Sequence, residues 1–169
     1  MGLTCADVMV PPEKQQTIRP EASVAEALRM IRTSRARFLP VVDATGRYVG
    51  VFSSPTLVKL ILPQAATIEM AASSGSGRLG NLRFLGLSRE DFAAQLDRLG
   101  GQRVADNLSR PENIPMADPA TPVLEGIRLI YKFKRHVMLV EPGSGRFVGT
   151  LSANSLLDQV LGPIDDLPE

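Results

Sequence analysis

The chain has 169 residues, of which 44% are hydrophobic and 22% charged, and its net charge is +1. This composition is typical of a folded globular protein, and it argues against a general nucleic-acid-binding protein, which usually carries a strong basic excess. A single cysteine, Cys5, excludes a disulfide framework and a cysteine-ligated metal cluster. No apolar run approaches the ~20 residues that cross a bilayer, and the N-terminus lacks the pattern of a secretory signal. We therefore expect a cytoplasmic protein with no membrane insertion.

An internal repeat with a constant offset of 99 residues organises the chain. Residues 6–62 align with 105–161 without a gap, and seventeen of the fifty-seven pairs are identical. The clearest match sets 46–50 against 145–149. Each copy alone is too short to bury a large core. We therefore expect the copies to pack together about a pseudo-twofold axis, with the crevices between them as candidate ligand sites.

In the first copy, a short helical turn is predicted over 4–9 and a brief strand over 16–18. Ser23 begins a helix, with Glu26 three residues later as a capping box. Its apolar residues repeat at helical spacing and are Val24, Ala27, Leu28 and Ile31.

A hairpin follows, with strands over 38–42 and 48–52 and a turn over 43–46. We expect Val49 and Val51 to share one face of the second strand. Ser53 or Ser54 caps the next helix. The apolar stripe of that helix is Leu57, Val58, Ile61 and Leu62.

The second copy predicts the same order of elements. A strand lies near 114–116, and a helix that starts at Thr121 carries Val123, Ile127 and Ile130. Strands over 137–140 and 146–151 form the hairpin around the turn 142–145. Ser152 caps a last helix, whose apolar residues are Leu156, Leu157, Val160 and Leu161. The predicted fold class is α/β, with one strand-helix-strand-strand-helix module used twice.

The copies are separated by an insert over 63–103. Its glycine- and serine-rich part, 71–77, is predicted to be mobile. Ser88 starts a helix with Phe92, Leu96 and Leu99 on one face and glycines as its stop. The predicted organisation is a first repeat over 1–62, a helical insert over 63–103, a second repeat over 104–162 and a tail over 163–169.

The motifs and their order resemble a tandem pair of CBS domains, named after cystathionine β-synthase and often called a Bateman module. The motifs that carry the resemblance are 6–9, 17–20, 23–28, 38–43 and 48–53. The resemblance implies two pseudo-symmetric β-α-β-β-α repeats packed together, with two clefts between them. It also implies frequent dimerisation and a regulatory role, commonly through adenosine-containing ligands.

The ligand signature of this family is Gly, two variable residues, Ser or Thr, two variable residues and Asp. The first copy matches it with Gly50 and Ser53 but has Thr56 at the Asp position. The second copy has Gly149, Ser152 and then Ser155. Neither copy has the acid that binds ribose hydroxyls, and both keep the hydroxyl-bearing helix start, where backbone N–H groups bind phosphate.

In the family, a basic residue before the first hairpin strand often contacts phosphate. Arg37 and His136 stand at that position in the two copies. The candidate ligand-binding residues are Thr17, Ile18, Arg37, Phe38, Leu39, Pro40, Ser53, Thr56, Ile114, Met116, His136, Val137, Met138, Ser152 and Ser155. Two simpler interpretations stay open, because helix caps explain the serines without a ligand and Arg37 also fits a solvated helix exit.

No catalytic or metal-binding constellation is recognisable around the one cysteine and the one histidine. We expect a non-enzymatic regulatory module that binds a small adenosine-type or other anionic metabolite in the clefts and signals through the geometry of a homodimer to an effector protein. An adenine nucleotide or an adenosyl compound is the candidate ligand. The alternative is a ligand-free scaffold for dimerisation and protein interaction, in which the nucleotide sites are degenerate.

Overall fold

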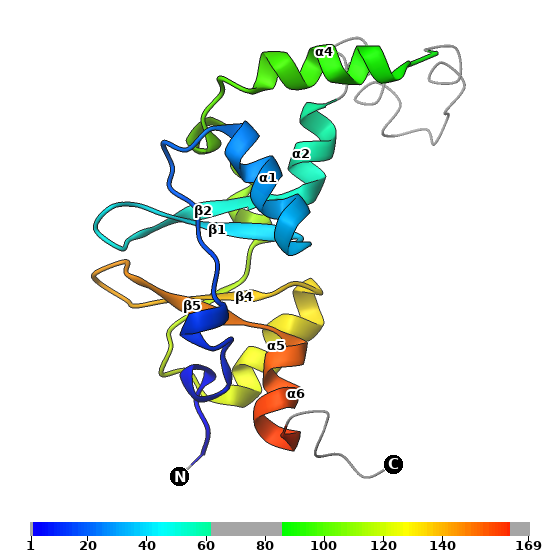
Figure 1. Cartoon of the computed structure of the whole chain (residues 1–169). Coiled ribbons are helices and arrows are strands. Elements are labelled where there is room, and N and C mark those ends of the chain that lie inside the picture. The colour runs from blue at the N-terminus through cyan, green and yellow to red at the C-terminus, as the bar shows by residue number, and fades with distance from the viewer. Residues whose placement is uncertain (1, 62–85, 163–169) are drawn as a thin grey trace. The chain divides into compact units, whose positions relative to one another are not determined.

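The computed structural model describes residues 2–61 and 86–162 (Figure 1). Contacts divide the chain into two compact units, which we call unit 1 and unit 2. Unit 1 comprises Met1–Pro20, Pro40–Val51 and Ser109–Glu169. Unit 2 comprises Glu21–Leu39 and Phe52–Leu108. Each unit therefore combines the body of one repeat with a segment from the other repeat.

Unit 1 contains a three-stranded sheet and two long helices. Its regular elements are β3 (Met116–Ala117), β4 (Val137–Val140), β5 (Phe147–Leu151), α5 (Val123–Phe133) and α6 (Ala153–Leu161). Its 3-10 turns are η1 (Cys5–Val8), η2 (Pro12–Lys14) and η5 (Pro111–Asn113). Strand β3 pairs with β4 in parallel and β4 pairs with β5 antiparallel, in the order β3-β4-β5.

The core of unit 1 joins the first and last parts of the chain. Its buried residues are Cys5, Val8, Val137, Leu139 and Leu151. The N-terminal turn η1 contacts α5, β5 and α6, and Figure 1 shows it in dark blue beside β5. Burial of these apolar side chains, at about 25 cal/mol per Å², fixes the N-terminal segment on the second repeat.

Unit 2 is helical at its periphery. It contains α1 (Val24–Ser34), α2 (Ser54–Leu60), α4 (Arg89–Leu99) and the 3-10 turn η4 (Val104–Asn107). Strands β1 (Phe38–Val42) and β2 (Tyr48–Ser53) form a two-stranded sheet, and the boundary between the two units crosses both strands. Among the described residues of this unit, the buried apolar ones are Val24, Ala27, Ile31, Leu39, Phe52, Leu57, Leu99 and Val104.

The helix starts follow the predicted capping residues. The Ser23 side chain accepts a hydrogen bond from Glu26 N–H at 3.1 Å and caps α1. Ser88 and Asp91 form a reciprocal capping box at the start of α4, and Gly100 ends that helix. These caps satisfy N–H groups that a helix end otherwise leaves unpaired.

The two repeats fold equivalently. The turns η1 and η4, the turns η2 and η5, and the helices α1 and α5 have bounds that lie 99 residues apart. The hairpin strands β1 and β4 begin 99 residues apart, as do β2 and β5. The repeat expected from the sequence is therefore confirmed as a structural repeat in a mixed α/β fold.

The N-terminal segment of each repeat is bonded to the other repeat. Cys5 N–H donates to the Thr121 carbonyl at 2.8 Å in unit 1. At the equivalent position of unit 2, Val104 N–H donates to the Ala22 carbonyl, also at 2.8 Å. The next pair of bonds is also reciprocal, because Val123 N–H donates to the Leu3 carbonyl at 2.9 Å and Val24 N–H donates to the Gln102 carbonyl at 2.8 Å.

A second reciprocal pair of backbone hydrogen bonds follows the turns η1 and η4. Val10 N–H donates to the Thr150 carbonyl, and Ser109 N–H donates to the Val51 carbonyl, each at 2.8 Å. These positions are again 99 residues apart on both sides of the bond. The repeats thus exchange their N-terminal segments about a pseudo-twofold relation.

The hairpins of the two repeats also meet within unit 1. Tyr48 N–H donates to the Gly145 carbonyl at 2.9 Å, and the rings of Tyr48 and Phe147 stack with centroids 6.2 Å apart. Burial raises the pKa of Tyr48 to about 12. The contact through the hairpins confirms the expectation that the two repeats pack on each other.

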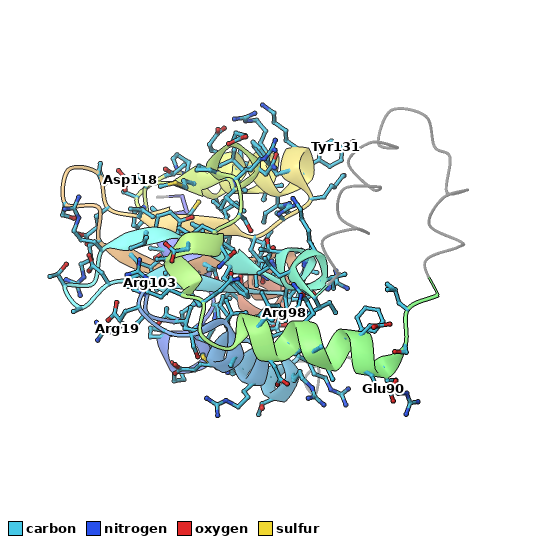
Figure 2. All side chains as sticks on the ribbon, turned by 90° about the horizontal axis from the view of Figure 1, so that it is seen from above. Arg19, Glu90, Arg98, Arg103, Asp118 and Tyr131 are labelled. Atoms are coloured by element: carbon cyan, nitrogen blue, oxygen red, sulfur yellow. The ribbon has the colours of Figure 1, made fainter. Side chains whose placement is uncertain are left out.

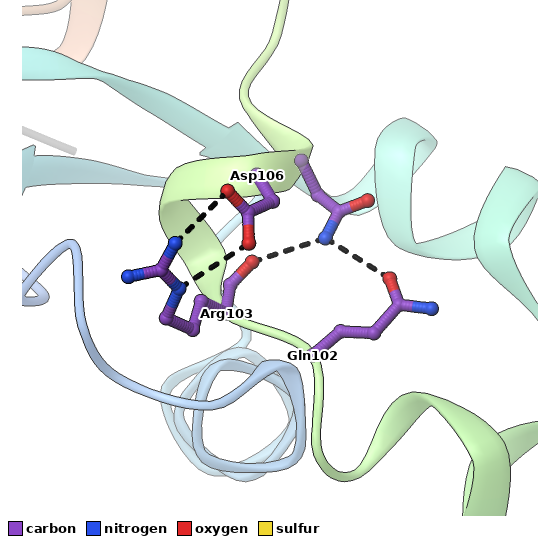
Figure 3. Close-up of polar contacts among 4 residues, drawn as sticks. Gln102, Arg103 and Asp106 are labelled. Carbon is purple, nitrogen blue, oxygen red and sulfur yellow. Dashed lines mark hydrogen bonds and ion pairs between the residues drawn. The ribbon is translucent and has the colours of Figure 1, made fainter.

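A polar cluster joins the end of the insert to η4 in unit 2 (Figure 3). Arg103 Nε donates to Asp106 Oδ2 at 3.3 Å, and the side chain of Asn107 donates to Gln102 Oε1 at 3.2 Å. Both members of the Arg103–Asp106 pair are exposed, so this ion pair contributes little, at most about 1 kcal/mol. The hydrogen bonds of the whole cluster connect the residues that lead from α4 into the second repeat.

Some residues of the predicted apolar faces are exposed in the structure. Val49 is 41% exposed, although Val51 is buried. In the last helix, Val160 is 56% exposed, although Leu156 packs against the core. Ile127 lies on the exposed side of α5. Helical or strand periodicity identifies an apolar face, but it does not determine whether the same chain covers that face.

Two further expectations have different outcomes. The strand predicted over 16–18 is reduced to one bridge, between Ile18 and Val41. The helix predicted after Ser88 is confirmed, with Leu99 buried and Phe92 and Leu96 half-buried. The glycine- and serine-rich part of the insert, 71–77, lies outside the described residues.

Candidate functional site

The second-repeat candidates lie at one end of the sheet in unit 1. Met116 is opposite Met138 in the parallel ladder, and Met138 N–H donates to the Pro115 carbonyl at 2.9 Å. Val137 is opposite Leu151 in the antiparallel ladder. Consequently the start of β4, where His136 stands, and the end of β5, where Ser152 stands, meet at the same edge.

This edge places a basic residue opposite the residue that caps a helix. His136 is half-buried and directly precedes β4, whereas Ser152 follows β5 and caps α6. The N-terminal N–H groups of a helix and its macrodipole favour an anion. A protonated His136 adds positive charge at the same edge.

The hydroxyls at the start of α6 are bonded to their own helix. Ser155 N–H donates to Ser152 Oγ at 2.9 Å, and Ser152 N–H donates to Ser155 Oγ at 3.0 Å. Ser155 Oγ donates in turn to the Ser152 carbonyl at 3.0 Å. Both residues are 6% exposed. A ligand that contacts the Ser155 hydroxyl therefore has to replace bonds of a closed capping box.

The apolar candidates of this repeat divide by burial. Val137, Met138 and Ile114 are buried, so their side chains belong to the core and their backbone atoms are the groups offered to a ligand. Met116 is 49% exposed. An exposed thioether beside a polar edge is suited to cover an aromatic ring.

The first-repeat candidates are divided between the two units. Thr17, Ile18 and Pro40 belong to unit 1. In that unit, Ile18 N–H donates to the Pro40 carbonyl at 3.0 Å, and Thr17 is exposed. The remaining members belong to unit 2 and are Arg37, Phe38, Leu39, Ser53 and Thr56.

In unit 2, the basic residue and the helix start are joined directly. Ser54 N–H donates to the Arg37 carbonyl at 2.8 Å, so Arg37 lies beside the N-terminus of α2. The Arg37 side chain is exposed, Phe38 is half-buried and Leu39 is buried. An arginine at the entrance of a helix N-terminus is chemically suited to an anionic group.

The capping hydroxyls of α2 repeat the arrangement in α6. Ser53 Oγ and Thr56 Oγ1 are 3.0 Å apart, and Thr56 N–H donates to Ser53 Oγ at 3.4 Å. Ser53 is buried and Thr56 is half-buried. The residue at the family's Asp position thus bonds back to the cap serine in both repeats.

The one thiol and the potential metal ligands bear on whether the described residues include a reactive centre. Cys5 is buried, and burial raises the pKa of its thiol, which disfavours a nucleophilic thiolate. Among residues 2–61 and 86–162, no cluster of histidine, cysteine and acidic side chains has the arrangement of a metal site. No helix in the described part of the chain is long and apolar enough to span a membrane.

Sequence reasoning missed one polar pair in unit 1, between the half-buried Gln15 and the buried Thr150. Gln15 Oε1 accepts hydrogen bonds from Thr150 N–H at 3.1 Å and from Thr150 Oγ1 at 2.9 Å. Thr150 is 2% exposed. The only available signal was an asymmetry of the repeat, because the equivalent positions, Ile114 and Val51, are apolar.

Comparison with known proteins identifies the family of the first repeat. Residues 5–63 match the CBS domain model. The chain is 22% identical over 160 residues to the chloroplastic CBS domain-containing protein CBSX2 of Arabidopsis thaliana, which covers 95% of the chain. The chain spans 64% of the length of that relative.

Solved structures share the fold over nearly the whole chain. The CBS-pair protein CBSX2 from Arabidopsis thaliana has a TM-score of 0.68 at 20% identity, covering 95% of this chain and 96% of that chain. CBSX2 in complex with AMP has a TM-score of 0.63 at 21% identity, covering 95% and 97%. A CBS domain-containing protein from Kribbella flavida has a TM-score of 0.66 at 21% identity, covering 95% and 99%.

Proposed function

Because the chain folds as a tandem pair of CBS domains, we propose that it is a regulatory module that binds an adenosine-type or other anionic metabolite. The proposal is supported chiefly by the edge of the unit 1 sheet where His136 and the Ser152 helix start meet. A similar fold, CBSX2, has been solved in complex with AMP. The module carries no catalytic function of its own, and its place is the cytoplasm.

In this proposal the helix start holds the phosphate and the basic residue neutralises it. The N-terminal N–H groups of α6 donate to phosphate oxygens, and His136 contributes charge when protonated. The first repeat offers Arg37 beside the start of α2. The adenine ring takes backbone hydrogen bonds along β3 and β4, under the exposed Met116 side chain.

Ribose recognition is the weak part of both sites. A carboxylate accepts two hydrogen bonds from neighbouring ribose hydroxyls, and a single hydroxyl group cannot replace both acceptors. The loss of a charged acceptor costs about 1.5–3 kcal/mol, which corresponds to roughly one to two decades of affinity. Binding in the micromolar range or weaker is therefore expected.

The decisive experiment restores the missing acid. The variants Ser155→Asp and Thr56→Asp are titrated with AMP in a calorimeter. Each is expected to bind AMP at least about tenfold more tightly than the unaltered chain. An acid at this position is compatible with the helix, because Asp91 occupies the corresponding capping position of α4. Asn154→Asp is the matched control, since it adds the same charge one residue earlier on an exposed surface.

Signalling requires that the ligand discriminate between two states of the assembly. We propose a homodimer as that assembly and an effector protein as the reader of its geometry. The exposed apolar residues of α6, Leu157, Val160 and Leu161, support an association surface. Sedimentation equilibrium that finds only an 18.3 kDa species at high micromolar concentration would contradict the dimer.

A ligand-free scaffold is the second candidate function. It is favoured by one observation, because the cap hydroxyls of both repeats are already bonded within their own helices. Under this alternative AMP does not stabilise the unaltered chain, and neither acid restores binding. Arg37→Ala and His136→Ala are then without effect in a thermal-shift titration of adenine nucleotides, where native-state binding raises the melting temperature.

A further inference from the structure

Helix α5 presents an apolar stripe to solvent. Leu124 and Tyr131 are each 75% exposed, and Ile127 is 38% exposed. Their spacing of three and four residues places them on one face of the helix. Tyr131 projects at the periphery of unit 1 (Figure 2). A neighbouring face of α5 packs on the core, through Val123 and Ile130.

The equivalent face in the first repeat is partly covered by the chain itself. Ala25 and Leu28 of α1 occupy the repeat positions of Leu124 and Ile127 and are half-buried, whereas Arg32, at the position of Tyr131, is exposed. In unit 2, the insert helix α4 packs on α1 (Figure 1), with Leu99 buried at 2% exposure. Gln95 of α4 also donates to the Leu60 carbonyl at 3.1 Å, which fixes the helix in place.

The contact between α1 and α4 leaves a shallow groove of about 260 Å³. The residues that line it are Val24, Ala25, Leu28, Arg29, Leu96, Asp97 and Leu99. Its floor is apolar, and Arg29 and Asp97 bring opposite charges to it from the two helices. The chain therefore contains an example of what fits this face: an amphipathic helix with apolar residues three and four positions apart and an acid beside them.

The charges around the α5 stripe extend this comparison. Arg128 occupies the repeat position of Arg29, and it is exposed beside its partner Glu125. The last turn and exit of α5 add further exposed basic residues, namely Lys132, Lys134 and Arg135. The rim of the stripe thus carries four basic side chains and one acidic one, so it is complementary to an acidic surface.

We propose that the face of α5 formed by Leu124, Ile127 and Tyr131 binds an acidic amphipathic helix of a partner protein, packed as α4 packs on α1. Large apolar and aromatic side chains with a charged rim are the usual anchors of helix recognition. This inference is independent of the proposed ligand site, because it rests on a different surface and needs no nucleotide.

The test uses a labelled peptide derived from α4. The peptide spans residues 87–101 and carries Arg89→Glu and Arg98→Glu, which retain the apolar face and make the helix acidic. Fluorescence anisotropy with the full chain is expected to show saturable binding, with a Kd on the order of 10 μM. Raising the ionic strength from about 0.05 to about 0.5 M is expected to weaken it.

Matched variants assign the binding to this face. Leu124→Ser combined with Tyr131→Ser is expected to weaken binding at least about tenfold. Val58→Ser, on the exposed side of α2, is expected to leave it unchanged. Because the three side chains are more than half exposed, the variants retain the fold, which a thermal melt verifies. Absence of peptide binding, or equal binding by both variants, overturns the proposal.

Two other occupants of the face are separable outcomes. If sedimentation velocity shows that the Leu124→Ser, Tyr131→Ser chain alone loses self-association, the face belongs to a second copy and the proposal is wrong. If the unaltered chain floats with vesicles containing about 20% phosphatidylglycerol and the same variant does not, the face binds a membrane and the proposal is again wrong.

Discussion

The two repeats hold their exchanged N-terminal segments with different chemistry. In unit 1 the segment is fastened by Gln15, whose amide oxygen accepts two hydrogen bonds from Thr150. The equivalent positions are Ile114 and Val51, and both are buried and apolar. The backbone bonds that dock the segments are the same in both repeats. Backbone pairing therefore sets the docking geometry of the segment. The side chains at these positions are polar in one repeat and apolar in the other.

A second difference lies where the long helix of each repeat meets the core. Gly126 of α5 faces Cys5 and Leu151 so closely that an added Cβ would lie 2.7 Å from the Cys5 sulfur and 2.5 Å from Leu151 Cδ2. The first repeat has Ala27 at the equivalent position. The second repeat thus tolerates less volume between helix and sheet, although the helix bounds are equivalent.

The largest effect is expected at this close approach. Gly126→Ala should lower the free energy of unfolding by about 1–3 kcal/mol, because overpacking of a well-filled core outweighs the better helix propensity of alanine. Urea denaturation measures the change. Cys5→Ala in the same chain should restore part of the loss, since the two sites couple. An unchanged unfolding midpoint in Gly126→Ala would show that the helix moves freely away from the sheet.

The hydrogen bonds between Gln15 and Thr150 give the next prediction. Gln15→Ala leaves the buried Thr150 hydroxyl and N–H without their acceptor, which should cost about 1–3 kcal/mol. The double variant Gln15→Ile, Thr150→Val copies the other repeat and should regain the part due to the hydroxyl. If the double variant is less stable than Gln15→Ala, the two repeats do not share an interchangeable docking geometry.

A smaller effect is expected at the helix exits. Arg35 and Lys134 occupy equivalent positions with φ of 56° and 55°, a left-handed conformation that favours glycine. Arg35→Gly should raise the free energy of unfolding by about 0.5–1 kcal/mol. Lys134→Gly should gain less, because Lys134 Nζ lies 4.0 Å from the centre of the Tyr131 ring. Thermal melts of the two variants compare the gains, and an equal gain contradicts a role for the cation–π contact.

The smallest effect is a difference between the two hairpin turns in how their local stability depends on pH. Hydrogen bonds from the Thr45 hydroxyl and then from Arg47 N–H hold the pKa of Asp43 below its ordinary value of 3.8. The ionised carboxylate therefore stabilises the first turn at pH values above 3.8. This contribution is lost as the pH falls through the lowered pKa. The second turn has Gly143 and Gly145 at positive φ and a proline, Pro142, at the repeat position of Asp43. Its nearby acid, Glu141, accepts a hydrogen bond from the Ser144 hydroxyl at 3.2 Å, whereas the Arg146 N–H donates to Ser144 Oγ.

Amide hydrogen exchange measures this difference. Below about pH 4, protection of the Thr45 and Arg47 amides should fall relative to that of Arg146 after correction for the intrinsic rate. Asp43→Asn should remove the pH dependence. Equal loss of protection in both turns would point to global unfolding instead of a local titration.

Local features of the sequence were sufficient for most of the secondary structure. The Ser88 cap and the glycine stop placed α4, and the apolar run over 38–42 placed β1 with its observed bounds. The exchange of N-terminal segments was not predictable in this way, because the bond from Cys5 to Thr121 joins residues far apart in the chain. No local pattern of polarity specifies such a pairing.

The candidate site was predicted only in part for a related reason. The signature residues Ser53 and Ser152 were expected at helix starts, and the structure places them there. The bonds of Ser155 within its own helix depend on side-chain orientation, which the motif does not encode. Likewise, the exposure of Ile127 and Val160 depends on which helix faces the chain covers, and periodicity is the same for covered and uncovered faces.

The exchanged N-terminal segments also constrain the order in which the protein is assembled. Residues 3–10 find their long-range hydrogen-bond partners and core neighbours in residues 117–156 of the second repeat. The N-terminal segment of the first repeat therefore stays incomplete until the second repeat has been synthesised. Contacts of such long sequence separation slow folding, and the early segment remains exposed meanwhile. A fragment cut at the repeat boundary therefore lacks one of its own edges, and the smallest autonomous folding unit is the pair.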